Sequence, residues 1–551
     1  MRRYQVRVIG DSLRVEQSGF HVQRHADPRG QVCFLRDYPM PELTRTADRV
    51  LEQGLPGLHD IPDNTVVFAI RHRDGVPELI AARDSLGNTP LYATDDESSP
   101  VFASDMSSLP SERSTTLNRA AVGEYLLFRY TSGPNTLRLG VSQPLASHAW
   151  VKDGQSVRHV PYRDLRNGFS GTGVRLAPQA LAACLRDSLA RENAFPHLGI
   201  MFSGGLDSTY IAAALHRTDL VLYSIGFPGI GAVDLEAAER EAAILRLPLK
   251  RVHVDRRGFA DRLPAAIRHF GWPIDHPNFV ARDILFEQAQ ADGIDRLLSG
   301  DGSDTVFGGA WYVALHKALL LKRWVPSIAR FAPPIHHRLR YISHILETPV
   351  EDLILFDKTY YPQSVARAFA QDAGDFAEHL RAQLRPVAGW DPLDQAFYIA
   401  HLTTLSIYPS AQRGMAWYWD DDVGYPFLNE RVVRLAQSVA GRAKVRGFVA
   451  KRIFLPVAAA AVSRQTMARR KYGLPVPFED FIFGPGGMFR YQDLLRERDT
   501  ATAEVISQCR VVELLDRLSA RKHTPDDLQL YWVILNLEIW ARQALRGEII
   551  A

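Results

Sequence analysis

The chain of 551 residues is longer than one typical domain, so we expect two or three domains around a large buried core. Its 46% hydrophobic and 23% charged residues are typical of a soluble globular protein, and a net charge of +3 gives no argument for nucleic-acid binding. The three cysteines are too scattered for a metal site or a disulfide framework, and no signal peptide or membrane span is evident, so we expect a cytoplasmic protein.

The first 165 residues predict a mostly antiparallel β domain with few helices. Short runs of alternating polarity are separated by Asp-Gly, Pro-Gly and Gly-Asn turns. These runs cover residues 4–9, 65–71, 78–82 and 100–103. The Gly-rich segment 167–173 indicates a linker, and we expect domain limits of 1–165 and 170–551.

Helix and strand signals alternate from residue 176 onward. Helices are predicted over 176–192 and 234–245, and strands over 199–202, 220–225, 249–254 and 296–299. This alternation predicts an α/β fold with a doubly wound parallel sheet. Beyond about residue 310 the periodicity is almost wholly helical, which indicates a large helical extension that ends in a long apolar helix over 527–545.

A Gly-rich turn joins the strand at 199–202 to the helix that follows. Gly204 and Gly205 let the backbone approach a bulky anion, and the N–H groups of the next helix point at that anion. Ser203 and Ser208 add hydroxyl donors. Asp207 would repel a bare phosphate, so we expect it to hold a divalent cation that bridges to phosphates. The turn is not a Walker A loop, because no Gly-Lys-Ser/Thr follows.

A second Gly-rich turn follows the strand at 296–299. Its Asp304 is a candidate second carboxylate for the cation, since carboxylates, phosphate oxygens and water are ordinary Mg²⁺ ligands. Ser299 and Gly300 offer small, hydrogen-bonding contacts to a nucleotide, although an acidic surface turn is the alternative reading. Ligands of such sheets bind beyond the carboxyl ends of the strands, so both turns can face one site.

The Ser203 loop resembles the pyrophosphate-binding loop of the ATP pyrophosphatases, which transfer AMP to a substrate oxygen. With later motifs in the expected order, residues 170–551 resemble the ligase domain of the asparagine synthetase family. Those motifs are Trp272 to Pro277, Met415 to Asn429, Lys451 to Ile453, Arg470 to Phe478 and Tyr531 to Trp540.

The resemblance implies ATP and Mg²⁺ as cofactors and assigns roles to named positions. Asp207 and Asp304 would hold the metal, and Lys471 would stabilise the oxyanion and the α-phosphate during amide formation. The residues expected to contact ATP or pyrophosphate are Phe202, Ser203, Gly204, Gly205, Asp207, Ser208, Ile225, Ser299, Gly300 and Lys451.

The N-terminal region resembles the glutamine amidotransferase half of the same family, through Phe68–Ile70, Ala82–Tyr92 and Phe102–Asp105. The resemblance implies an Ntn-type β-sandwich with flanking helices. The nucleophile of that half is a cysteine directly after the initiator methionine, whereas Arg2 stands here. The glutamine-site motifs "RHRGPD" and "NGEIYN" are also missing, so we expect a degenerate domain without glutaminase activity.

Without glutamine as nitrogen source, the nucleophile is expected to be an amine already present on a substrate. Two branches of the family resemble this arrangement, the β-lactam synthetases and the lasso-peptide macrolactam synthetases. The former have a catalytic tyrosine where this chain has Asp301, which favours the latter. The acid that accompanies this tyrosine would fall near Asp420, Asp421 or Asp422, and an acid such as Asp422 is a candidate base for the amine. Asp301 is itself a candidate catalytic residue.

The lasso branch implies an adenylated Asp or Glu side chain of a precursor peptide, closed into a macrolactam by the peptide's N-terminal amine. It further implies a leader peptidase and a leader-recognition protein as partners, in antibiotic biosynthesis, and neither nucleic acid nor membrane. A β-lactam-type or ammonia-using ligase for a small molecule stays open, as does an ATP-binding scaffold without catalysis.

Overall fold

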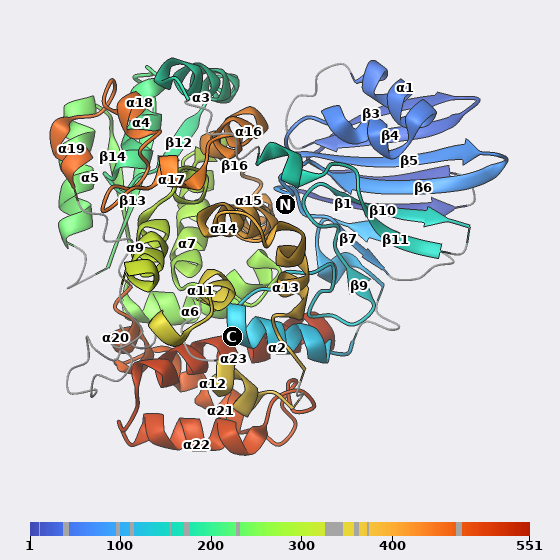
Figure 1. Ribbon diagram of the computed structural model, residues 1–551. Helices are drawn as coiled ribbons and strands as arrows, with labels where there is room; N and C mark the ends of the chain where they lie inside the picture. Colours follow the sequence, from blue (N-terminus) through green and yellow to red (C-terminus); the bar gives the residue numbers. More distant parts are fainter. Residues whose placement is uncertain are drawn as a thin grey trace.

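The computed structural model describes two packed parts, a β-rich part and a larger helical part (Figure 1). The described residues are 1–9, 12–36, 43–94, 100–110, 115–154, 156–169, 176–227, 232–324, 345–356, 363–371, 374–469 and 476–550. Among the described helices, none combines the length and the apolarity needed to cross a bilayer.

The N-terminal part is a sandwich of two antiparallel sheets, as the sequence predicts. One sheet has the order β2-β1-β8-β7-β9 and the other β11-β10-β6-β5-β4-β3. The strands are β1 (Arg3–Ile9), β2 (Ser12–Ser18), β3 (His21–Asp27), β4 (Gly30–Arg36), β5 (Thr65–Arg73), β6 (Val76–Arg83), β7 (Tyr92–Thr94), β8 (Val101–Ala103), β9 (Val141–Ser142), β10 (His148–Asp153) and β11 (Ser156–Pro161).

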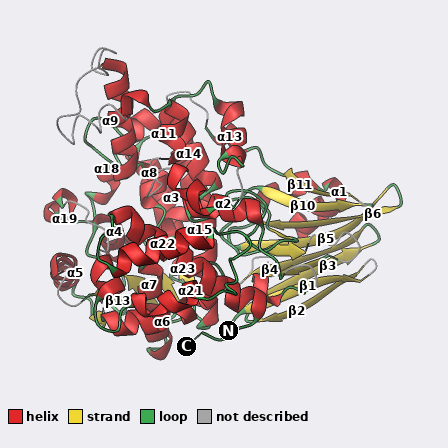
Figure 2. Ribbon diagram, turned by 90° about the horizontal axis from the view of Figure 1, so that it is seen from below, coloured by secondary structure: helices red, strands yellow, loops and turns green. Residues whose placement is uncertain are grey.

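The strand β5 shows why this sandwich forms. Val66, Phe68 and Ile70 point into the core between the two sheets. Val67 and Ala69 point to the opposite face, where they pack with the helix α1 (Thr44–Gln53). Successive side chains of a strand alternate between faces, so a strand with five consecutive apolar residues, 66–70, must be covered on both sides. Figure 2 shows the strands of this sandwich gathered at one side of the molecule.

The second part is built on a five-stranded parallel sheet with the order β14-β13-β12-β15-β16. Its strands are β12 (Leu198–Met201), β13 (Val221–Gly226), β14 (Leu249–His253), β15 (Arg296–Leu298) and β16 (Val423–Gly424). The chain runs outward from β12 to β14 and then returns to β15 on the other side of β12. The strand order therefore reverses between β12 and β15, and ligands of such sheets bind beyond the carboxyl ends at this point.

The remaining described helices comprise one helix of the N-terminal region, the helices that cover this sheet, and the extension predicted from the sequence. They are α2 (Arg119–Phe128), α3 (Pro178–Glu192), α4 (Leu206–Ala214), α5 (Ala232–Leu245), α6 (Arg256–Phe270), α7 (Asn278–Ala291), α8 (Ser303–Phe307), α9 (Ala310–Trp324), α11 (Val350–Phe356), α12 (Gln363–Phe369), α13 (Glu378–Leu384), α14 (Pro392–Leu402), α15 (Thr404–Tyr418), α16 (Glu430–Gln437), α17 (Gly441–Lys444), α18 (Leu455–Ala458), α19 (Arg464–Ala468), α20 (Phe478–Phe483), α21 (Gln492–Arg496), α22 (Gln508–Ser519) and α23 (Pro525–Arg546).

The helix α23 begins two residues before the predicted position. Thr524 and Asp527 form a reciprocal capping box there, with Pro525 at the first helical position. Gly547 ends the helix in a left-handed conformation, with φ of 68°. The strand β16 was not predicted, because two residues are too short to show a period.

A ligase-side tryptophan joins the two parts. Trp417, near the end of α15, is 1% exposed and belongs to the core cluster of the N-terminal sandwich. Its ring lies 5.0 Å from the ring of Phe20 in an edge-to-face arrangement. Arg2 donates its backbone N–H to the Trp417 carbonyl, and its guanidinium bonds to Asp420. The interface is therefore continuous with a hydrophobic core.

The predicted linker lies partly outside the described residues, since 170–175 are not described. The residue before that segment, Phe169, is buried and packs against Trp390 and Tyr398 of the helical part. The domain limits of 1–165 and 170–551 stay predictions.

Candidate active site

The loop after β12 has the form expected of an anion-binding turn. Gly204 has φ of 62° and lies against the backbone of Ala237, where an added Cβ would come within 2.5 Å. Gly205 caps α4, and its N–H donates to Ser203 Oγ at 3.3 Å. The Ser203 N–H donates to Ser208 Oγ, also at 3.3 Å. The first N–H groups of an α-helix have no partner within the helix, so the start of α4 favours a phosphate.

The second turn lies directly against this loop. Gly300 approaches the first turn of α4 so closely that an added Cβ would lie 3.1 Å from Asp207 Cβ. Ser303 Oγ donates to Asp207 Oδ1 at 2.7 Å. The Ser299 N–H donates to the Gly424 carbonyl at 2.9 Å, which fixes the turn to β16. The structure thus brings the two Gly-rich turns together at the point where the strand order reverses.

The two predicted metal carboxylates converge on one lysine. Lys451 Nζ lies 2.7 Å from both carboxylate oxygens of Asp207 and 2.9 Å from Asp304 Oδ1. The lysine is buried and holds a left-handed backbone, with φ of 52°. Two carboxylates that share one ammonium are close enough to share a cation, and both offer the oxygen ligands that Mg²⁺ prefers. The donor set therefore fits the metal expected from the sequence.

The remaining predicted nucleotide contacts lie on neighbouring strands. Phe202 is buried, and its N–H donates to the Tyr223 carbonyl at 2.7 Å. Ile225 is half-buried on β13, one strand further from the loop. Their roles in nucleotide binding stay predictions.

Lys471 lies outside the described residues. The segment before it reaches the loop, because Arg469 Nη1 donates to the Ser203 carbonyl at 3.2 Å. Arg469 therefore borders the site, although the sequence assigned it no role.

Asp301 and Asp422 occupy different environments. Asp301 follows Gly300 and forms a bidentate pair with Arg282 of α7, at 2.5 and 3.2 Å. Asp422 is fully buried between Arg413 at 3.0 Å and Arg296, beside the start of β15 rather than its carboxyl end. This geometry favours a structural position for Asp422, and its proton-transfer role stays a prediction.

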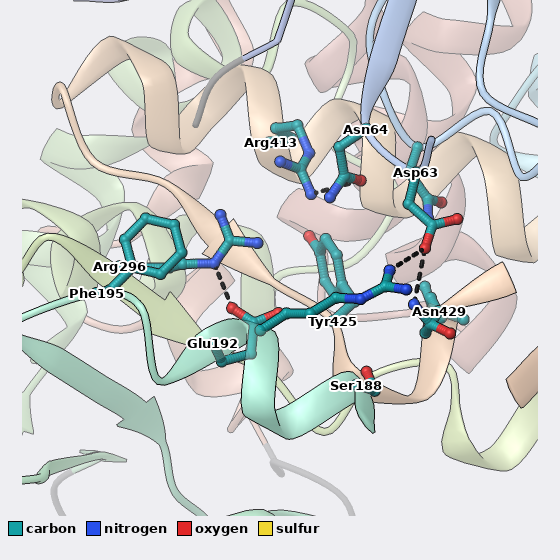
Figure 3. A pocket seen from close by; sticks show the side chains of 12 residues that line it. Asp63, Asn64, Ser188, Glu192, Phe195, Arg296, Arg413, Tyr425 and Asn429 are labelled. Atoms are coloured by element: carbon teal, nitrogen blue, oxygen red, sulfur yellow. Dashed lines mark hydrogen bonds and ion pairs between the residues drawn. The ribbon is translucent and has the colours of Figure 1, made fainter. Parts of the chain in front are cut away.

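Between the two parts lies a polar pocket that is partly open to solvent (Figure 3). Asp63 and Asn64 of the N-terminal part face Arg413 and Asn429 across it. Asn429 Nδ2 donates to Asp63 Oδ2 at 2.8 Å, and Arg413 Nη2 donates to Asn64 Oδ1 at 3.1 Å. Burial, with the nearby charge of Glu430, raises the pKa of Asp63 to about 7.

The Trp272 to Pro277 motif lines a second pocket between the parts. Trp272 Nε1 donates to the Tyr92 hydroxyl at 2.7 Å. The Asp275 carbonyl accepts from Arg129 at 2.7 Å and from Trp532 at 3.1 Å. This motif therefore joins the N-terminal part to α23. Its contacts give this Pro-rich turn a role in packing.

Comparisons with known proteins agree with this architecture. Residues 180–542 match the family model described as asparagine synthase, and residues 57–163 match the model of a glutamine amidotransferase domain. Asparagine synthetase [glutamine-hydrolyzing] 1 of Bacillus subtilis is 22% identical over 482 residues, which are 84% of this chain and 75% of that protein. Asparagine synthetase B of Escherichia coli is 28% identical over 289 residues, 48% of this chain and 46% of that protein.

Among solved structures, an NH3-dependent NAD synthetase from Campylobacter jejuni is 15% identical to this chain. The matched region spans 42% of this chain and 94% of the synthetase chain. The TM-score is 0.20, which is too low to support any argument.

Proposed function

The chain belongs to the asparagine synthase family and is an ATP-dependent carbon–nitrogen ligase of that family, and on this premise we propose that its substrate is a precursor peptide. The enzyme would adenylate an Asp or Glu side chain and join it to the peptide's N-terminal amine. The products are a macrolactam, AMP and pyrophosphate, as in lasso-peptide biosynthesis.

One observation supports an amine on the substrate, rather than glutamine, as the source of nitrogen. Residues 1–165 contain a single cysteine, Cys33, on the strand β4. Its side chain is 2% exposed, and burial raises the pKa of its thiol to about 11. A nucleophilic cysteine must be reached by its substrate as a thiolate, so Cys33 does not meet the requirement for glutamine hydrolysis. With Arg2 bonded to Asp420, this supports a structural role for the amidotransferase-like part.

The adenylation step uses groups that the two Gly-rich turns place together. The loop from Ser203 to Ser208 and the start of α4 bind the phosphates of ATP, and the acceptor carboxylate attacks the α-phosphate. Lys451 is proposed to neutralise the departing pyrophosphate, and its contacts with Asp207 and Asp304 support this role. The family generally uses Mg²⁺ with ATP, and here Asp207 and Asp304 would hold the ion, which neutralises phosphate charge.

In the amide-forming step, the amine attacks the acyl carbon while the bond from that carbon to the AMP oxygen breaks. Lys471 is proposed to stabilise the oxyanion, and the neighbouring Arg469 contact supports the approach of this segment to the loop. A leader peptidase and a leader-recognition protein are the proposed partners, since the free N-terminal amine has to be produced before ring closure.

The test incubates the purified protein with MgATP and synthetic linear peptides that carry a free N-terminal amine and one Asp or Glu side chain. The expected result is pyrophosphate release together with a peptide product lighter by one water. Asp207→Ala should abolish both. An N-acetylated copy of the same peptide is the matched control, since it offers the carboxylate without the nucleophile and should yield no cyclic product.

Two other outcomes would redirect the proposal. Turnover of a small β-amino acid, or of aspartate with ammonia, in place of every peptide would favour the small-molecule alternative. ATP binding without pyrophosphate release for any carboxylate would favour the non-catalytic scaffold. Release of glutamate from glutamine would contradict the structural role of the N-terminal part.

A further inference from the structure

An arginine that the sequence did not single out lies beside the two turns. Arg282 of α7 pairs through Nη1 and Nη2 with both carboxylate oxygens of Asp301. Its Nη1 also donates to Gln412 Oε1 at 2.7 Å, and Gln412 Nε2 contacts the sulfur of Met201 at 3.6 Å. Met201 is the last residue of β12, directly before the Ser203 loop. Three elements therefore hold this guanidinium at the edge of the nucleotide site.

The pair follows directly on the turn that touches the Ser203 loop. Asp301 follows Gly300, which touches Asp207, and an added Cβ on Gly300 would lie 3.3 Å from the N–H nitrogen of Ser208. The side chains remain reachable, since that of Arg282 is 21% exposed and that of Asp301 is 39% exposed. The buried pairs Arg413–Asp422 and Arg296–Asp422 are closed to solvent by comparison, with exposures of 0 to 2%.

An amide ligase that uses an amine on its own substrate must recognise two opposite charges before reaction. These are the carboxylate to be adenylated and the ammonium form of the nucleophile. An arginine fork matches a carboxylate in a bidentate geometry, and an aspartate matches an ammonium group. We propose that the Arg282–Asp301 pair is the acceptor-recognition element, in which Arg282 binds the substrate carboxylate and Asp301 binds the substrate amine.

This inference rests on the proposed function and extends it to the binding of the acceptor. In the free enzyme Arg282 and Asp301 neutralise each other. When the substrate binds, this ion pair breaks, and two pairs form between the enzyme and the substrate. Gln412 keeps Arg282 in place during the exchange, because its amide oxygen bonds to the guanidinium independently of Asp301. Each charge-assisted bond to the substrate corresponds to about 10- to 100-fold in affinity.

The experiment measures KM for ATP and for a synthetic peptide with a free N-terminal amine and one glutamate. The variants are Arg282→Gln, Asp301→Asn and a swapped double variant, Arg282→Asp with Asp301→Arg. We expect the KM for the peptide to rise about 10- to 100-fold in each, with MgATP affinity unchanged. The swap keeps the ion pair but reverses its polarity. A purely structural pair would therefore be rescued by the swap, and such a rescue would overturn the inference.

A control pair far from the site is Arg496–Asp516, which joins α21 to α22 at 2.9 Å. Arg496→Gln should leave both KM values unchanged, and any loss there equal to that in Arg282→Gln would also overturn the inference. Wild-type enzyme that releases no pyrophosphate with any peptide overturns the proposed function and this assignment together. Active wild-type enzyme with unaltered peptide KM in all three variants overturns the assignment alone.

Discussion

The ammonium of Lys451 bridges the carboxylates of Asp207 and Asp304, the same two groups that the sequence predicts as metal ligands. A divalent cation held by these two residues would share its oxygens with the lysine. An ammonium that moved towards a phosphate would leave carboxylate oxygens to the metal, so binding of the cation and of the pyrophosphate would be coupled.

Replacement of Lys451 by methionine should strengthen Mg²⁺ binding while it stops turnover. Met keeps the length of the buried stem and removes the positive charge that competes with the cation. A repulsion of about 1.4 kcal/mol between the two cations corresponds to about tenfold in Mg²⁺ affinity. Thermal shift against Mg²⁺ concentration measures this change, and pyrophosphate release measures the loss of activity.

Lys250→Met is the control for that experiment. Lys250 lies on the half-exposed edge strand β14, where it pairs with Asp292, a residue outside that strand. It should leave the Mg²⁺ dependence unchanged. Equal or weaker Mg²⁺ binding in the Lys451 variant would contradict a shared set of oxygens.

Asp422→Asn distinguishes a structural carboxylate from a base. Its side chain is fully buried between Arg296 and Arg413, and removing the charge breaks the ion pair of Asp422 with each of them, while Arg296 keeps its pair with Glu192. Breaking a buried ion pair in this way costs about 3–5 kcal/mol. We expect a lower midpoint of urea unfolding, with kcat of the folded enzyme within about threefold of wild type. Asp420→Asn, at an exposed neighbouring residue, is the control and should change neither the unfolding midpoint nor kcat. A large fall in kcat at unchanged stability would restore the role as a base.

The edge-to-face contact between Phe20 and Trp417 should couple the unfolding of the two parts. Truncation of either ring to alanine should cost about 3–5 kcal/mol, because both lie in the sandwich core. A double-mutant cycle should show a coupling of about 0.5–1.5 kcal/mol. Calorimetry of Trp417→Ala should resolve two transitions in place of one. Trp540→Ala on α23 is destabilising as well, but should be additive with Phe20→Ala.

The sequence predicted the two Gly-rich turns and their meeting, because strand-turn-helix patterns and the parallel sheet both leave local signals. It did not reveal Arg282, Ser303 or Trp417 as partners across elements. Arg282 sits in an ordinary amphipathic helix, and Trp417 resembles any aromatic core residue, so only the packing of distant segments identifies them. The two arginine partners of Asp422 could not be read from the sequence for the same reason, since they lie in β15 and α15.

The carboxyl of Asp63 should make the stability of the domain interface depend on pH. Burial raises its pKa to about 7, above the value of about 3.9 for an unfolded chain. Between these values the folded protein binds the proton more tightly than the unfolded chain does, so stability falls as pH rises from about 4 to 7. The full effect is at most about 4 kcal/mol, reached above pH 7. Asp63→Asn removes this penalty, so the free energy of unfolding of the variant relative to wild type should rise between pH 5 and 8. Denaturant unfolding across this range measures it, with Asp187→Asn, an exposed residue of α3, as the control. An Asp63 variant whose difference from wild type is the same at both pH values would show that the carboxyl is ionised throughout.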